Sequence, residues 1–80
     1  MSTMRLTITT IDSILWDDEA QEVVVPGKEG VMTVLPHHVP LVSELTKGKI
    51  VVKMNGTQTP FDCNGGFLEI GKDRTILLLS

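Results

Sequence analysis

Residues 50–61 read Ile-Val-Val-Lys-Met-Asn-Gly-Thr-Gln-Thr-Pro-Phe, which places Asn55-Gly56 between two runs of strand-forming residues. Asn-Gly is the strongest short signal for a β-hairpin, because both residues tolerate the positive φ angles of a type I′ turn. This stretch therefore predicts an antiparallel hairpin of residues 50–54 and 57–61. Pro60 has no backbone N–H, so the returning strand is expected at a sheet edge or a bulge.

Further strands are predicted on both sides of this hairpin. Residues 5–11 alternate polar with apolar side chains, which puts Leu6 and Ile8 on one buried face. Residues 26–30 form a five-residue connection whose glycines can take positive φ angles, so it predicts a reversal with an exposed tip. The remaining predicted strands are residues 23–25, 31–35, 67–70 and 75–79. No segment predicts a helix.

The composition favours an all-β fold. Val, Ile and Thr are abundant, whereas Ala20 is the one alanine, and branched side chains fit a pleated sheet better than a helix. Turn-forming residues recur at short intervals, among them Lys47-Gly48 and Asn64-Gly65-Gly66. Short strands at such spacing predict a β-sandwich or barrel. With 80 residues the chain is expected to form one domain, residues 1–80.

The formal net charge of −3 argues against a nucleic-acid partner. The seven Lys and Arg residues are scattered along the chain, so the sequence contains no basic run that would follow phosphates. The N-terminus shows neither the apolar stretch of a signal peptide nor the Arg-rich pattern of a transit peptide. The longest apolar run, residues 76–79, is far shorter than the roughly 20 residues of a membrane helix. No direct membrane insertion is therefore expected.

The pair His37-His38 is the first candidate for a metal site. Adjacent residues of an extended segment point to opposite sides, and no second Cys or His motif accompanies the pair. The acidic residues 17–19 lack the spacing of a calcium loop and predict a solvated turn. We therefore expect no metal site and no cofactor.

The sequence contains no recognisable catalytic motif. Cys63 has no motif partner and is expected in the core, and Gly65-Gly66 lacks the pattern of a phosphate-binding loop, which indicates a tight turn or close strand packing. The residues alone favour an interaction module without a small-molecule substrate. Two other classes remain open: a stand-alone ligand- or carbohydrate-binding β-sandwich that uses Trp16, and a small metal-dependent enzyme built on His37, His38, Asp17 and Asp18.

Several motifs in register resemble one known family. Residues 25–30, Val-Pro-Gly-Lys-Glu-Gly, are followed by residues 34–41, Val-Leu-Pro-His-His-Val-Pro-Leu, and this pair resembles the hallmark of the epsilon subunit of F-type rotary ATP synthases. Lys47-Gly48 before a strand and Gly-Gly-Phe-Leu-Glu-Ile at residues 65–70 match two further family features. The resemblance covers essentially the whole chain.

The resemblance implies a flattened β-sandwich of about ten short strands at the foot of a rotor. Such a domain is a non-catalytic subunit that packs on the gamma subunit and touches the ring of c subunits. It couples the translocation of protons or sodium ions through the ring to ATP synthesis. In a bacterium it lies peripherally on the cytoplasmic face of the inner membrane.

The resemblance also implies two contact surfaces. The loop with Glu29, Gly30, Val31 and Met32 is expected to face the polar loops of the c ring. Val31 and Met32 present apolar side chains where related sequences often carry an acid first and a glycine at the site of Thr33, so this contact is expected to be more hydrophobic than usual. The residues expected on the gamma-facing side are Thr10, His38, Val39, Pro40, Leu41 and Ser43.

Full-size relatives of this family continue into a C-terminal pair of helices. These helices can extend along gamma to inhibit hydrolysis, and in some members they bind ATP. The present sequence stops at Ser80, where the predicted sandwich finishes. Regulation by helix extension is therefore not expected of this chain.

Overall fold

Two 14-residue strands, β5 (Leu41–Met54) and β6 (Thr57–Ile70), dominate the computed structural model, which describes residues 2–80. The two strands pair antiparallel along nearly their whole length. Asn55 and Gly56 form the turn between them with φ angles of 51° and 78°, as a type I′ turn requires. The predicted hairpin is thus confirmed, and it is the end of a much longer ribbon.

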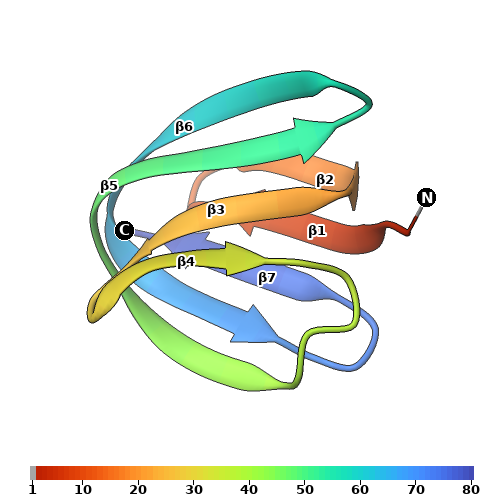
Figure 1. The fold of residues 1–80 in the computed structure, drawn as a ribbon. Coiled ribbons are helices and arrows are strands. Elements are labelled where there is room, and N and C mark those ends of the chain that lie inside the picture. The colour runs from red at the N-terminus through yellow and green to blue at the C-terminus, as the bar shows by residue number, and fades with distance from the viewer. Residues whose placement is uncertain (1) are drawn as a thin grey trace.

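The turn expected at residues 47–48 is wrong, because this segment lies inside β5. Of the two expectations for Gly65-Gly66, the tight turn is wrong, because these glycines lie inside β6, whereas close strand packing is confirmed, because a Cβ atom on Gly66 would lie 2.1 Å from the Leu78 carbonyl oxygen. The two strands bend there together without a shift in register. A Cβ atom on Gly48 would lie 2.8 Å from the Cβ of Pro26, and Gly65 has a φ angle of 124°, so glycine is required on both strands. The bend carries the ribbon from one layer of the molecule to the other (Figure 1).

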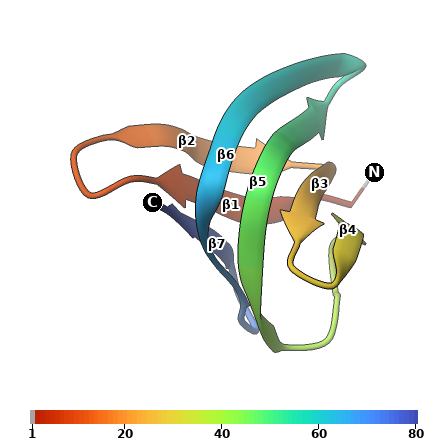
Figure 2. The ribbon, with the colours of Figure 1, turned by 90° about the vertical axis from the view of Figure 1, so that its left-hand side faces the viewer.

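Shorter strands complete a seven-stranded sheet in the order β2-β1-β7-β6-β5-β3-β4. They are β1 (Met4–Thr9), β2 (Ile14–Ala20), β3 (Glu22–Gly27), β4 (Gly30–Val34) and β7 (Thr75–Leu79). Strand β1 pairs parallel with β7 and antiparallel with β2, while β3 lies between β4 and β5. Because β5 and β6 bend, the sheet curls and its two ends form separate layers (Figure 2).

The all-β sandwich is confirmed. One layer contains β2, β1, β7 and the part of the β5–β6 ribbon beside β7, and the other contains β3, β4 and the part that ends in the Asn-Gly turn. The strands number seven, against about ten expected, since β5 and β6 each run through both layers and are counted once. Trp16 of β2 meets Phe61 of β6 edge to face, with ring centroids 6.4 Å apart, and so joins the layers.

The core lies between the two layers and follows the predicted alternation. Leu6 and Ile8 of β1 are fully buried as expected, and so is Cys63 of β6. The other large, fully buried side chains are Ile50, Leu68, Leu77, Val23, Val25, Val34 and Val52. Burial of an aliphatic side chain of this size stabilises the fold by about 1.5–3 kcal/mol. Both layers therefore contribute to a single core.

The structure corrects two local expectations. Residues 17–19, expected as a solvated turn, lie on the edge strand β2, which escaped prediction because acidic residues are rare in strands except at sheet edges. The expected connection at residues 26–30 is a two-residue turn, because Gly27 pairs with Gly30.

Pro60 lies at a sheet edge as predicted, since its half of β6 pairs with β5 alone among the described strands. No helix within residues 2–80 has the length and apolar character needed to cross a membrane.

Candidate functional site

The turn between β3 and β4 projects from one end of the sandwich (Figure 1). Lys28 and Glu29 form this turn, and Gly30 begins β4 with a φ angle of 139°. Glu44 of β5 holds the turn in place: its carbonyl oxygen accepts a hydrogen bond from the Lys28 N–H at 2.9 Å, and its carboxylate lies 3.4 Å from Lys28 Nζ. These polar contacts with Glu44 position the tip, and the outer surface of the tip is exposed to solvent.

Alternation along β4 separates the two apolar residues of the tip. Val31 is 76% exposed, whereas Met32 is half-buried and packs against the core. Of the residues expected to face a c ring, Glu29, Gly30 and Val31 share an exposed surface, while Met32 supports that surface from inside. Val31 is thus the apolar side chain that the tip offers to a partner.

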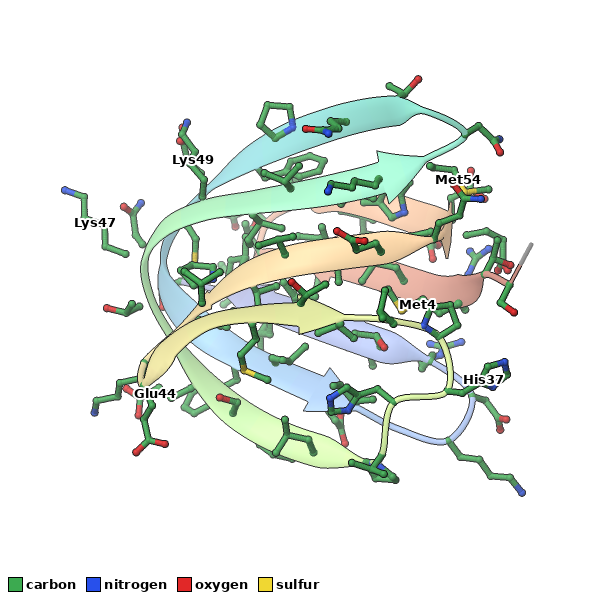
Figure 3. The ribbon with its side chains drawn as sticks, viewed as in Figure 1. Met4, His37, Glu44, Lys47, Lys49 and Met54 are labelled. Atoms are coloured by element: carbon green, nitrogen blue, oxygen red, sulfur yellow. The ribbon has the colours of Figure 1, made fainter. Side chains whose placement is uncertain are left out.

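The loop between β4 and β5 crosses the opposite end of the molecule. Figure 3 shows His37 at this end and Glu44 at the other. His38 is half-buried; its N–H donates to the Leu35 carbonyl at 3.3 Å, and its Nδ1 lies 2.8 Å from the Val39 carbonyl oxygen. Two further residues expected to face gamma, Val39 and Pro40, are exposed on this loop.

The remaining residues expected to face gamma lie on two separate elements. Leu41 begins β5 and packs against the core, and Ser43 is half-buried two residues further along the same strand. Thr10 lies in the loop after β1, where its hydroxyl accepts a hydrogen bond from the N–H of Ser13 at 3.1 Å. Residues 38–43 form one continuous segment of the chain. Thr10 lies apart from this segment, because β7 and β6 separate β1 from β5 in the sheet.

An exposed apolar patch, which sequence reasoning missed, covers the outer face of the layer between Thr10 and β5. Phe67 of β6 pairs with Leu78 of β7, and both side chains are about half exposed, at 55% and 50%. Leu78 also pairs with Thr9 of β1, which pairs in turn with Ile14 of β2. We call this patch the apolar face; its members are Ile11, Ile14, Val42, Phe67 and Leu78.

The apolar face follows from the alternation of the two strands at its centre. Leu68 and Leu77 are fully buried, so their neighbours Phe67 and Leu78 must point outward. Ile11, which is 94% exposed, lines a shallow hollow together with both of these residues. The predicted strands at residues 67–70 and 75–79 already imply that side chains alternate between two faces. Which of these faces is the outer one could not be assigned without the sheet order.

Ion pairs of the described residues connect neighbouring strands. Arg5 donates to the Asp17 carboxylate at 2.7 Å, and this hydrogen bond holds the pKa of Asp17 below its usual range. The hydrogen bond from Lys49 likewise lowers the pKa of Asp62. Within residues 2–80, no three His, Cys, Asp or Glu side chains are grouped so that they could hold a metal ion. These carboxylates therefore serve strand pairing, and the surfaces described above are the candidates for function.

Comparison with known proteins places the chain in one family. Residues 3–80 match the family described as ATP synthase, Delta/Epsilon chain, beta-sandwich domain. The chain is 37% identical over 78 residues to the ATP synthase epsilon chain of Dehalococcoides mccartyi (strain CBDB1), covering 98% of this chain and 56% of that protein. It is 35% identical over 78 residues to the chloroplastic ATP synthase epsilon chain of Pinus koraiensis, covering 98% and 57%. The chain thus spans little more than half the length of these relatives.

Solved structures share the fold. A chain in the Euglena gracilis mitochondrial ATP synthase structure (OSCP/F1/c-ring, rotational state 1) matches with a TM-score of 0.91 and 22% identity, covering 99% of this chain and 51% of that one. A chain in the Tetrahymena thermophila mitochondrial ATP synthase central stalk/c-ring structure matches with a TM-score of 0.80 and 12% identity, covering 98% and 63%. At these identities the likeness describes the fold alone.

Proposed function

Because this chain belongs to the family of the ATP synthase Delta/Epsilon chain beta-sandwich domain, we propose that it is a non-catalytic central-stalk component of an F-type ATP synthase. In this proposal residues 1–80 act as one domain, contact gamma and the c ring, and help to couple proton or sodium translocation to ATP synthesis. The domain lies at the membrane surface as part of the complex, on the cytoplasmic face of the inner membrane in a bacterium. The match of residues 3–80 to this family is the observation that carries the proposal.

The apolar face supports a contact with gamma. Thr10, expected to face gamma, lies near one border on the loop after β1, and Val42 lies at the other border on β5. Ser43, also expected to face gamma, pairs with buried Leu68 and points to the inner side of the same strand. Exposed apolar side chains that gather on one sheet face gain about 25 cal/mol per Å² when a partner covers them. In the proposal gamma therefore covers the apolar face and the neighbouring residues 38–41.

The tip of the β3–β4 hairpin supports a separate contact with the c ring. Glu29, Gly30 and Val31 are exposed there, and Val31 offers an apolar side chain for burial. We assign the direct contact to these three residues. Met32 then acts indirectly, because its side chain packs against the core beneath the tip.

The experiment compares two charge substitutions with a matched control. Val31→Lys introduces a charge at the tip, Val42→Asp introduces one on the apolar face, and Thr57→Lys introduces one beside the Asn-Gly turn. All three positions are exposed, so each variant should fold, whereas a charge at Leu41 would also disturb the core. An unpaired charge buried at an interface costs a few kcal/mol, so binding of the affected partner should fall at least about tenfold.

The readouts are affinity for purified gamma, retention on c-ring vesicles together with gamma, and ion-driven ATP synthesis by the reconstituted complex. Val42→Asp should weaken gamma binding, Val31→Lys should weaken the ring contact and coupling, and Thr57→Lys should change neither. If Val31→Lys abolishes gamma binding while the ring contact stays intact, the two surfaces have been assigned the wrong way round. If none of the three variants affects coupling, the proposed function is wrong for this chain.

A further inference from the structure

A cavity of about 320 Å³ opens at the end of the sandwich opposite the β3–β4 tip. Its walls come from the start of β1, the β4–β5 loop and the β6–β7 turn, with one residue from β2. Figure 3 shows Met4 and His37, which belong to the first two of these segments, at this end of the molecule. At roughly 30 Å³ per water molecule, the volume is enough for a small hydrated anion.

The cavity brings together basic side chains that are far apart in the sequence. Arg5 comes from β1, Lys72 and Arg74 come from the β6–β7 turn, and His37 and His38 come from the β4–β5 loop. Three of the seven Lys and Arg residues and both histidines therefore line one cavity, in a chain whose formal net charge is −3. With Glu19 and Asp73 counted, three basic against two acidic side chains give the lining a formal charge of +1, and Arg5 is paired with Asp17 outside the lining. The unpaired positive charge therefore comes from Lys72 and Arg74, which favours an anionic ligand beside these two residues.

Lys72 and Arg74 are available to a ligand. The acidic residues of the cavity are Glu19, which accepts a hydrogen bond from the Thr3 hydroxyl at 2.6 Å, and Asp73 in the turn itself. Within residues 2–80, neither Lys72 Nζ nor the Arg74 guanidinium has a carboxylate within 4.0 Å. Both side chains are exposed at the cavity mouth and keep all of their N–H donors.

The walls from β1 and from the β4–β5 loop differ in the contacts that they can make with a ligand. Arg5 already donates to the Asp17 carboxylate, which also offsets its charge, so Arg5 adds little to the binding of an anion. His37 is exposed, and its φ angle of 68° suits the third position of a turn that begins at Leu35 and is closed by the hydrogen bond from the His38 N–H. His37 therefore contributes an imidazole to the cavity lining from a turn that is held by its own backbone hydrogen bond.

We propose that this cavity binds a phosphate-type oxyanion through Lys72, Arg74 and His37. Guanidinium and ammonium groups form charge-assisted hydrogen bonds with phosphate oxygens, and an imidazole N–H adds a third donor from a different direction. The phosphate group has two sources to distinguish, namely inorganic phosphate or pyrophosphate in solution and the headgroup of an anionic phospholipid. The proposal concerns the chain by itself, so it stands or falls independently of the subunit role.

The test titrates pyrophosphate into the ¹⁵N-labelled chain at constant ionic strength and follows amide and imidazole signals by NMR. Saturable shifts are expected at residues 71–75 and at both histidines. Lys72→Ala/Arg74→Ala should weaken binding at least about tenfold, because two charge-assisted contacts are removed. The matched control Lys47→Ala/Lys49→Ala removes the same charge at a different part of the surface and should leave binding unchanged (Figure 3).

Cosedimentation with vesicles distinguishes the two sources. Binding to phosphatidylglycerol vesicles that pyrophosphate displaces identifies the lipid headgroup, whereas pyrophosphate binding without vesicle binding identifies the free anion. Either result supports the site, provided that the double variant at residues 72 and 74 weakens the binding at least about tenfold. The proposal is overturned if no saturable shift occurs, if the shifts spread over all lysines, or if both double variants lose binding equally.

Discussion

Gly66 on β6 lies so close to Leu78 on β7 that a Cβ atom on the glycine would be 2.1 Å from the leucine's carbonyl oxygen. Gly66 also has a φ angle of 136°, a conformation that L side chains rarely adopt. The glycine thus allows both the bend in β6 and the close approach of β7. It also allows Leu78 to pair beside Phe67 on the apolar face. A requirement of the backbone therefore decides the position of the apolar face.

Gly66→Ala should destabilise the domain strongly, because the added methyl group meets backbone atoms that cannot move aside. We expect the free energy of unfolding in urea to fall by about 2–4 kcal/mol. Gly71→Ala is the control: its Cβ would lie 3.5 Å from the Arg74 carbonyl oxygen, an ordinary contact, so the loss should be under about 1 kcal/mol. Equal losses would contradict the steric explanation.

The neighbours Leu68 and Phe67 provide a test of which face of β6 is the core. Leu68→Ala should lower the free energy of unfolding by about 2–5 kcal/mol, because it leaves a cavity in a fully packed interior. Phe67→Ala removes a larger side chain from the exposed face and should cost less than about 1 kcal/mol in the free chain. The measurement compares the two losses in free energy of unfolding. A larger loss for Phe67→Ala than for Leu68→Ala would mean that Phe67, and not Leu68, faces the core.

The Trp16–Phe61 contact should be visible by fluorescence. Trp16 is the single tryptophan, so its emission reports on the Phe61 ring alone among nearby aromatic groups of the described chain. Phe61→Leu should shift that emission and reduce the stability by about 0.5–1.5 kcal/mol. Phe67→Leu changes the other phenylalanine and should leave the emission unaltered. An unchanged spectrum in Phe61→Leu would show that the rings do not meet in solution.

The Arg5–Asp17 pair predicts a pH dependence of stability. Its hydrogen bond lowers the pKa of Asp17 in the folded state below the ordinary value of 3.8, so the pair stabilises the fold above that value. The contribution is lost as the pH falls through the folded-state pKa. Arg5→Gln should raise the pKa of Asp17, which a carboxyl NMR titration measures.

Denaturation at several pH values completes this test. The difference in stability between the native chain and Arg5→Gln should be largest near neutral pH and should shrink in acid. In an Asp17→Asn background the same arginine substitution should show no such dependence, since the titrating group is absent. A difference that persists unchanged at low pH would assign the effect to packing of the Arg5 side chain.

The sequence by itself determined the local features of this protein. Asn55-Gly56 specifies its hairpin because the turn geometry depends on two adjacent residues. The alternation around Leu6 and Ile8 specifies a buried face because successive side chains of a strand point to opposite sides. The four motifs at residues 25–30, 34–41, 47–48 and 65–70, taken together in register, likewise identified the family.

Only the tertiary structure decided which residues meet across strands. The glycines at residues 48, 65 and 66 looked like turns, but the continuous β5–β6 ladder makes them bends at points where other backbone atoms or Pro26 approach closely. The acidic strand β2 forms because β1 offers it a free edge, and the cavity gathers Arg5, Lys72 and Arg74 because β1 lies parallel to β7. Such contacts depend on the order of strands in the sheet, which is set by the burial of the whole core and cannot be read from neighbouring residues.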